Sequence, residues 1–179
     1  MSGLLKGLAH LSSRRIMHRD LKPENLLFRG TGKNSEIVIA DFGLAANVDA
    51  EQHLFVRCGT PGYVAPEVIN IVDMKTKTDP ICDVFSAGII MHMLLLGRSV
   101  FNGKTYDKIL VENRACDFKL EGADYAKLDV EAMDLMSRML KVEPKDRVSA
   151  AAALRHPYLV DKSAPILRPL SVQSLSPTE

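Results

Sequence analysis

Apolar residues recur at helical spacing in several parts of the chain and predict a mostly helical fold. Leucines spaced three or four positions apart form one stripe near the N-terminus, which predicts a helix over residues 2–13. Residues 84–96 form an apolar run with no polar face, which is typical of a helix buried on all sides. Because Ser86 and His92 interrupt this run and it is too short to span a bilayer, we interpret it as a core helix.

Small polar residues mark where further helices are expected to begin. Thr105 can cap a helix that runs to about Arg114, because its hydroxyl can accept a bond from a backbone N–H of the first turn. Asp129 precedes a stretch with one apolar face and is expected to cap it in the same way. Ser149 precedes an alanine-rich stretch, whose helix is expected to stop before Pro157.

Two short apolar runs predict a β-hairpin. They cover residues 26–28 and 37–39, and the segment 30–35 between them contains two glycines, which is typical of a turn. That segment also resembles an incomplete glycine-rich phosphate-binding loop. Because Ser35 stands where such a loop has its third glycine, we interpret the segment as a turn. The predicted fold class is therefore mostly α with a small β-hairpin.

The chain is expected to form one folded domain over residues 1–160, followed by a flexible tail. A chain of 179 residues with 46% hydrophobic content can bury one good core. Residues 41–67 look loop-like, since no period of either kind is visible there. Prolines and serines accumulate from position 161 to 179, which predicts that this segment is flexible.

Composition limits the classes of partner and the compartment. The formal net charge is +1, from 23 basic and 22 acidic residues, with no basic stripe, so we expect no nucleic acid partner. The cysteines at positions 58, 82 and 116 fit neither a disulfide framework nor metal-ligand spacing, which indicates a reducing compartment. No secretory or myristoylation pattern is visible, so we expect a cytoplasmic protein without a membrane partner, with the nucleus as the alternative.

Three motifs carry the candidate chemistry. Residues 18–25 read His-Arg-Asp-Leu-Lys-Pro-Glu-Asn and place a carboxylate, an ammonium and an amide in one loop. Residues 41–43 read Asp-Phe-Gly and directly follow an apolar strand, and residues 65–67 read Ala-Pro-Glu. In this order the motifs resemble the catalytic loop, the metal-binding loop and the end of the activation segment of a eukaryotic protein kinase.

The resemblance covers about residues 3–160 and implies a protein-kinase-like C-terminal lobe, that is, the α+β kinase fold lacking its N-terminal lobe. No glycine-rich loop, Val-Ala-Ile-Lys strand or partner glutamate precedes the catalytic loop, and in the family these parts cover and align the ATP phosphates. The wording of residues 58–67 and 155–158 is similar to the calcium/calmodulin-dependent kinase group. The chain is therefore expected to be a fragment of such a catalytic domain.

The resemblance implies a protein serine/threonine kinase, which transfers the γ-phosphoryl group of ATP to Ser or Thr hydroxyls of proteins with Mg²⁺ as cofactor. In the family pattern Asp20 is the base that accepts the hydroxyl proton, and Lys22 contacts the γ-phosphate. Thr60 would bond to both side chains. Alone, such an Asp or Lys would be an ordinary solvated residue. The Lys-Pro-Glu-Asn context favours function and a Ser/Thr acceptor.

The same resemblance assigns the remaining site residues. Asn25 and Asp41 would hold Mg²⁺, because oxygen ligands suit this hard ion. Leu27 matches the floor beneath adenine, although a core leucine is an equally natural interpretation. The nucleotide-binding set is Lys22, Glu24, Asn25, Leu27 and Asp41, and the substrate-binding set is Glu24, Thr60 and Gly62. The structural set is His18, Arg19, Phe42, Gly43, Glu67, Asp83 and Arg147, with Glu67 and Arg147 forming a buried ion pair, His18 and Asp83 bracing the loop, and Phe42 stacking on His18.

Regulation and partners follow from the segment between the motifs. Residues 44–59 contain no Ser, Thr or Tyr, so the usual phosphate switch has no acceptor there. If this segment is ordered, it is ordered without phosphate, with Asp49 or Glu51 as candidates to face Arg19. The expected partners are ATP and a protein substrate; calmodulin binding is not supported, since no basic amphipathic helix follows Val160. The alternative function is a non-catalytic kinase-lobe module that binds protein partners.

Overall fold

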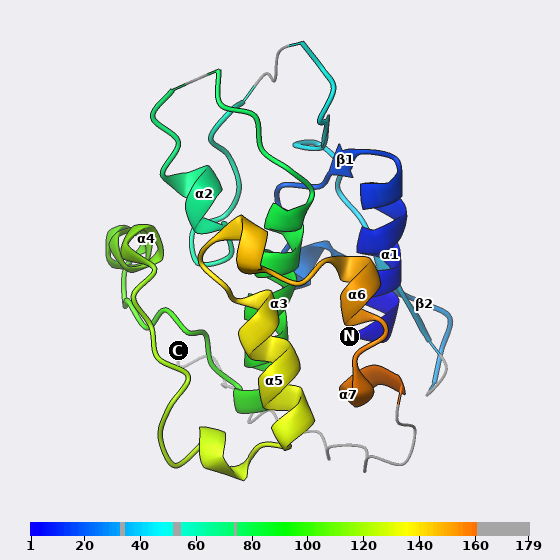
Figure 1. The fold of residues 1–179 in the computed structure, drawn as a ribbon, viewed down its shortest axis with the longest axis vertical. Helices are drawn as coiled ribbons and strands as arrows, with labels where there is room; N and C mark the ends of the chain where they lie inside the picture. Colours follow the sequence, from blue (N-terminus) through cyan, green and yellow to red (C-terminus); the bar gives the residue numbers. More distant parts are fainter. Residues whose placement is uncertain (33–34, 52–54, 74, 161–179) are drawn as a thin grey trace, which may run out of the picture.

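The computed structural model describes residues 1–32, 35–51, 55–73 and 75–160. Within these ranges the chain is helix-rich, with two small two-stranded sheets, so the predicted helical fold class is confirmed (Figure 1). The helices are α1 (Ser2–Ser13), α2 (Pro66–Ile69), α3 (Ile81–Leu96), α4 (Tyr106–Ala115), α5 (Val130–Met139), α6 (Ala150–Ala153) and α7 (Pro157–Val160). Short 3₁₀ turns are formed by Pro23–Asn25, Tyr125–Lys127 and Pro144–Asp146.

Helix α3 forms the centre of the core, as its uninterrupted apolar sequence predicts. All its residues from position 82 to 92 are buried, including Ser86 and His92. Gly97 ends the helix in the left-handed conformation at φ 69°, which glycine adopts without steric cost. Helices α1 and α5 pack against α3, while α2 and α4 lie together on the other side of Figure 1. The core therefore holds both the segment before the catalytic loop and the segment after the Ala-Pro-Glu motif.

The predicted helix caps are confirmed. A side-chain oxygen accepts a backbone N–H of the first turn at the start of α4, α5 and α6, which satisfies donors that a helix leaves unpaired. Helix α6 is short and ends at Ala153, and Pro157 opens α7 as a separate turn. The capping contacts are Thr105 Oγ1 to Lys108 N at 3.4 Å, Asp129 Oδ1 to Glu131 N at 2.9 Å, and Ser149 Oγ to Ala152 N at 3.2 Å.

The predicted hairpin is formed by β2 (Leu26–Arg29) and β3 (Glu36–Ile39), which pair antiparallel. This pairing confirms the hairpin interpretation over the phosphate-loop one; residues 33 and 34 of the connecting segment lie outside the described ranges. The Ser35 hydroxyl donates to the carbonyls of Gly30 and Gly32 at 3.2 and 2.8 Å, so it closes the turn on itself. The hairpin packs on α1 at the right edge of Figure 1.

A second small sheet was not predicted. Strand β1 (Ile16–Met17) pairs antiparallel with β4 (Ala46–Asn47). Of these two strands, β4 lies inside the region 41–67 that was expected to be loop. Two-residue strands are too short to leave a periodic signal, which is why the sequence does not reveal them. The ladder holds the chain after the Asp-Phe-Gly motif beside the chain before the catalytic loop. The expected flexible tail at 161–179 lies outside the described residues and stays a prediction.

Candidate catalytic site

Three polar side chains from distant parts of the sequence meet at the catalytic loop. The Thr60 hydroxyl donates to Asp20 Oδ1 at 2.6 Å, and Lys22 Nζ donates to Thr60 Oγ1 at 3.1 Å. Lys22 Nζ also lies 3.0 Å from Asp20 Oδ2, which closes a triangle. Asn25 donates from Nδ2 to the backbone carbonyl of Asp20 at 2.8 Å and so fixes the loop beneath this triangle.

The environment of Asp20 favours its ionised form. Partial burial acts to raise the pKa of Asp20, but hydrogen bonds from Thr60 and Lys22 and the positive charge of Lys22 outweigh that effect. The pKa of Asp20 therefore lies below its ordinary value, and the carboxylate is charged at neutral pH. A charged, positioned carboxylate can orient a hydroxyl group and accept its proton.

The two expected magnesium ligands lie at one end of the hairpin. Asn25 directly precedes β2, and Asp41 is the second residue after the end of β3. Because the Ala40 amide donates to the carbonyl of Asn25 at 2.9 Å, the pairing continues past the strands and brings these two positions together. Asn25 is buried with 6% exposure, and among the described residues its side chain forms hydrogen bonds only through Nδ2. Asp41 is exposed and uses Oδ1 to accept the Gly43 amide at 3.2 Å. Each residue thus keeps a side-chain oxygen for a further contact.

The catalytic loop is fixed to the core by one buried carboxylate. Asp83, in the first turn of α3, accepts the backbone N–H groups of His18 and Arg19 at 2.7 and 2.9 Å. Burial raises the pKa of Asp83, and the two backbone donors partly offset this effect. His18 Nε2 bonds to the Ala40 carbonyl at 2.9 Å, and the His18 and Phe42 rings meet edge to face at 5.0 Å. His18 therefore joins the catalytic loop to the Asp-Phe-Gly motif.

Arg19 binds the activation segment through backbone carbonyls. Its Nε donates to the Leu44 carbonyl at 2.7 Å, and its Nη1 donates to the Phe55 carbonyl at 2.5 Å. The expectation that Asp49 would face Arg19 is wrong, because Asp49 binds Arg15 instead, at 2.6 and 2.8 Å. Arg15 lies beside β1, which pairs with the strand next to Asp49, so the ladder selects this partner. The guanidinium group of Arg19 thus donates its hydrogen bonds to backbone carbonyls.

Glu67 and Arg147 form a bidentate ion pair, with Nη1–Oε1 at 2.6 Å and Nη2–Oε2 at 2.9 Å. The Arg147 side chain is fully buried, and Glu67 keeps 20% exposure. Arg147 also donates to three backbone carbonyls and lies 5.1 Å above the ring of Phe85. Each nitrogen of the guanidinium therefore has an acceptor, which a buried charge requires.

Gly62, one of the expected substrate-binding residues, is held in place by a side chain of α4. Gly62 donates its backbone N–H to Asn113 Oδ1 at 2.8 Å, and Asn113 Nδ2 donates to the Val64 carbonyl at 2.9 Å. Asn113 is fully buried on α4, and the sequence analysis missed it because the residues around it in that helix are exposed and polar. Glu24 is exposed, and Leu27 is 54% exposed, so the interpretation of Leu27 as a core leucine is wrong.

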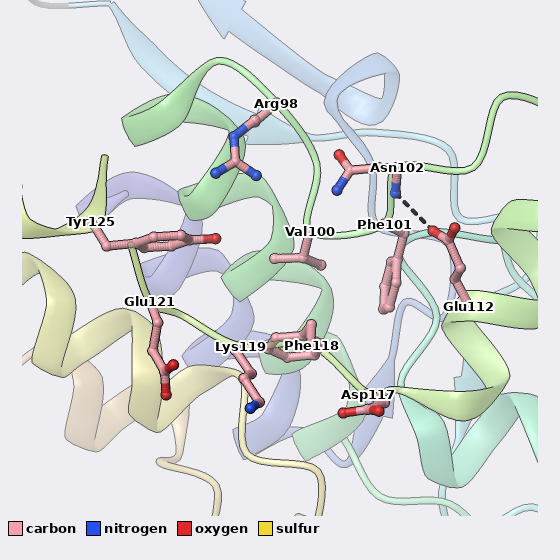
Figure 2. Close-up of a pocket in the computed structure, with 10 residues that line it drawn as sticks. All are labelled: Arg98, Val100, Phe101, Asn102, Glu112, Asp117, Phe118, Lys119, Glu121 and Tyr125. Carbon is pink, nitrogen blue, oxygen red and sulfur yellow. Dashed lines mark hydrogen bonds between the residues drawn. The ribbon is translucent and has the colours of Figure 1, made fainter. Parts of the chain in front are cut away.

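A separate cavity lies near the C-terminal end of α3 and contains none of the expected site residues. Its volume is about 450 Å³, and Figure 2 shows Arg98 beside Tyr125 and Phe101 facing Phe118 across it. The two phenylalanine rings meet edge to face at 5.9 Å, and the Arg98 guanidinium lies 5.5 Å above the Tyr125 ring. The charged residues on its rim have both signs, so the cavity has no clear electrostatic preference. Across the described ranges, we find no helix with the length and apolar character needed to cross a membrane.

Comparison with known proteins shows the family of this chain. Residues 1–159 match the family described as the protein kinase domain. The chain is 39% identical over 159 residues to calcium/calmodulin-dependent protein kinase cmkB of Emericella nidulans, a match that covers 87% of this chain and 38% of the relative. It is 34% identical over 160 residues to calcium-dependent protein kinase 5 of Plasmodium berghei (strain Anka), covering 89% of this chain and 28% of the relative.

The chain thus spans less than two fifths of the length of these curated relatives. The match nevertheless covers the catalytic loop, the Asp-Phe-Gly motif and the core helices that hold them. This chain belongs to the protein kinase family, with relatives among the calcium- and calcium/calmodulin-dependent kinases.

Proposed function

We propose that this chain is the helical C-terminal lobe of a protein serine/threonine kinase that uses ATP and Mg²⁺. The observation that carries the proposal is the closed triangle of Asp20, Lys22 and Thr60, with contacts of 2.6 to 3.1 Å. A carboxylate, an ammonium and a hydroxyl held this closely provide an acceptor for a proton and a positive charge for a phosphoryl group. Phosphoryl transfer needs this positioning and charge stabilisation more than covalent chemistry by the protein.

Each member of the triangle has a separate task. Asp20 orients the substrate hydroxyl and accepts its proton, and its lowered pKa keeps it ionised for that task. Lys22 places its positive charge beside Asp20, where it offsets negative charge on the group being transferred. Thr60 ties the activation segment to both side chains, so that segment is in place when the acceptor binds. A Ser or Thr acceptor is supported by the Lys-Pro-Glu-Asn context of the loop.

The residues at the end of the hairpin fit a magnesium–nucleotide complex. Asn25 and Asp41 offer an amide oxygen and a carboxylate oxygen, which are the hard ligands that Mg²⁺ prefers. ATP would supply the phosphoryl group, and Mg²⁺ would offset the charge of its phosphates. Leu27 presents 54% of its surface on the same hairpin, in a position to contact a base.

Exposed apolar surface supports the proposal that another lobe covers this one. Leu27 and Phe28, which point to opposite faces of the hairpin, and Phe42 after it are 54%, 71% and 47% exposed, so large apolar side chains around the hairpin lack cover. A cavity of about 1210 Å³ lies between α1 and β3 and reaches Phe42. We infer that an upper lobe, from a longer polypeptide or from a partner, packs on this face and completes the nucleotide site.

The same apolar face favours a second candidate function, a non-catalytic module that binds protein partners. In that case the cavity beside α1 would hold a partner rather than a catalytic lobe. The two functions differ in a simple property: only the kinase requires ATP with Mg²⁺. Stabilisation of the chain by ATP and Mg²⁺ in a thermal-shift measurement favours the kinase, since a ligand that binds the folded state raises its apparent stability.

The direct test is phosphoryl transfer by the polypeptide at its native length. An antibody raised against residues 44–59 isolates the protein, and its mass is compared with the 19.8 kDa of this chain. We expect a heavier species that transfers phosphate from ATP to Ser or Thr of a mixed protein substrate. The variant Asp20→Asn should lose the transfer, and Glu143→Gln, which changes an exposed acid outside the triangle, should keep it.

A species near 19.8 kDa that neither transfers phosphate nor is stabilised by ATP and Mg²⁺ would overturn the kinase proposal and favour the binding module. Phosphotyrosine as the main product would contradict the Ser/Thr assignment alone. Phosphoamino-acid analysis of the labelled substrate separates these outcomes.

A further inference from the structure

A small cavity lies beside Thr60, between the activation segment and α4. It measures about 200 Å³ and is lined by residues immediately before and after Thr60, including Arg57 and Pro61. Leu110 and Arg114 of α4 form its other wall. Since Thr60 bonds to Asp20, the cavity opens next to the place where the acceptor hydroxyl must lie.

The volume of the cavity suits one amino-acid side chain. The cavity is well above the ~10–15 Å³ of probe volume that a single water needs. Small-molecule and cofactor sites are larger, at about 300–1,000 Å³. In size, the cavity therefore matches a single side chain of a bound peptide better than a nucleotide or a cofactor.

The charge on the lining has one sign. Arg57 and Arg114 are its ionised side chains, and no carboxylate lines the cavity. Both arginines are exposed, and among the described residues neither guanidinium has a hydrogen bond or an ion pair. This distinguishes them from Arg15, Arg19 and Arg147, whose guanidinium groups are bound by acids or carbonyls.

The floor of the cavity is apolar. Pro61, Val64, Ile69 and Leu110 contribute to the lining, so the methylene groups of an incoming side chain would lie on carbon. A short aliphatic stem that ends in a carboxylate fits this combination, because the stem meets the floor and the charge meets the two guanidinium groups. Guanidinium groups bind carboxylates through paired N–H donors, which adds geometric selectivity to the charge attraction.

We propose that this cavity binds an Asp or Glu side chain of the protein substrate, close in sequence to the phosphorylated residue. An extended peptide advances about 3.3–3.6 Å per residue, so the acidic residue is expected within about two positions of the acceptor. The inference rests on the proposed kinase function. It adds a preference that the catalytic triangle does not itself require.

The test is a positional peptide library with a fixed Ser or Thr acceptor, phosphorylated by the polypeptide at its native length. We expect Asp and Glu to be preferred over Asn and Gln by about three- to tenfold at one position near the acceptor, a modest factor because exposed ion pairs are screened. The double variant Arg57→Glu, Arg114→Glu should reverse the preference toward Lys and Arg at that position. A misfolded protein cannot produce such a reversal. Arg155→Glu changes an exposed charge two residues after the end of α6, outside the lining of the cavity, and should keep the original preference.

Two outcomes of the library experiment would overturn the inference. One is equal use of acidic and neutral residues at every position near the acceptor. The other is an acidic preference that the double variant retains.

A binding measurement separates this inference from the kinase proposal. Fluorescence anisotropy with the 179-residue chain compares one peptide that carries Glu with its twin that carries Gln. If the native-length polypeptide transfers no phosphate, the kinase proposal fails, but tighter binding of the Glu peptide, lost in the double variant, would still support the cavity as an acid site. Equal binding of the two peptides would overturn it.

Discussion

Replacing Arg147 by Met should be among the most destabilising single changes in the chain. The Arg147 side chain is fully buried, and the change leaves Glu67, at 20% exposure, without its partner. Breaking a buried pair by removing one member costs about 3–5 kcal/mol. The carbonyls of Ile81, Lys141 and Val142 also lose a donor. We therefore expect a loss of about 4 kcal/mol, a large share of the ~5–15 kcal/mol that stabilises a typical domain.

Urea unfolding of the 179-residue chain, followed by circular dichroism, measures this loss as a fall in the midpoint at constant slope. The double variant Arg147→Met, Glu67→Met removes the stranded charge as well and should recover part of the stability, while the carbonyls that Arg147 served still lack their donor. Arg155→Met, at an exposed position, is the control and should stay within about 0.5 kcal/mol of the parent. A loss under about 1 kcal/mol for Arg147→Met, or a double variant no more stable than the single one, would refute the reasoning.

Further predictions concern the loops around the triangle. The pKa of Asp20 is lowered, so its stabilising effect is complete above its ordinary pKa of 3.8 and is lost as pH falls through the lower folded-state value; NMR titration of its carboxyl carbon should give a midpoint below 3.8. Asn113→Ala leaves two buried backbone groups unpaired and should cost about 2–3 kcal/mol in urea unfolding, whereas the exposed Val111→Ala should cost under about 0.5. Gly59 has φ 109°, and an added Cβ would lie 2.6 Å from the Arg19 carbonyl, so Gly59→Ala should lower the unfolding midpoint more than Gly30→Ala, whose site has φ 89° and open space. Similar midpoints for the two glycine variants would contradict the close approach.

The helices could be predicted from the sequence because their signals are local. The leucine stripe of α1 and the apolar run of α3 lie within single elements, and the caps Thr105, Asp129 and Ser149 act on N–H groups two or three residues away. Hydrophobic period and side-chain capping depend on nearest neighbours along the chain, so a single sequence contains them.

The partners of the site residues could be predicted only where a family motif specifies them. The roles of Asp20 and Thr60 came from the resemblance, since nothing local connects two residues forty positions apart. Asn113 and the partner of Arg19 escaped prediction for the same reason. The first acts on backbone groups some fifty positions away, and the second depends on the β1–β4 ladder, which draws Asp49 to Arg15. Such contacts depend on the tertiary arrangement rather than on any pattern along the chain.

Asp83 connects the catalytic loop to the core, so this part of the loop is expected to open only when the core opens. Its carboxylate holds the amides of His18 and Arg19, and it belongs to the first turn of the most buried helix. Segments that open locally do so when few buried contacts hold them, whereas groups bonded to the core open only when the core does. The amide hydrogens of His18 and Arg19 should therefore exchange with solvent as slowly as those of α3. The catalytic loop is thus anchored at these two amides to the most buried helix, and larger movements are expected in segments that the core does not hold.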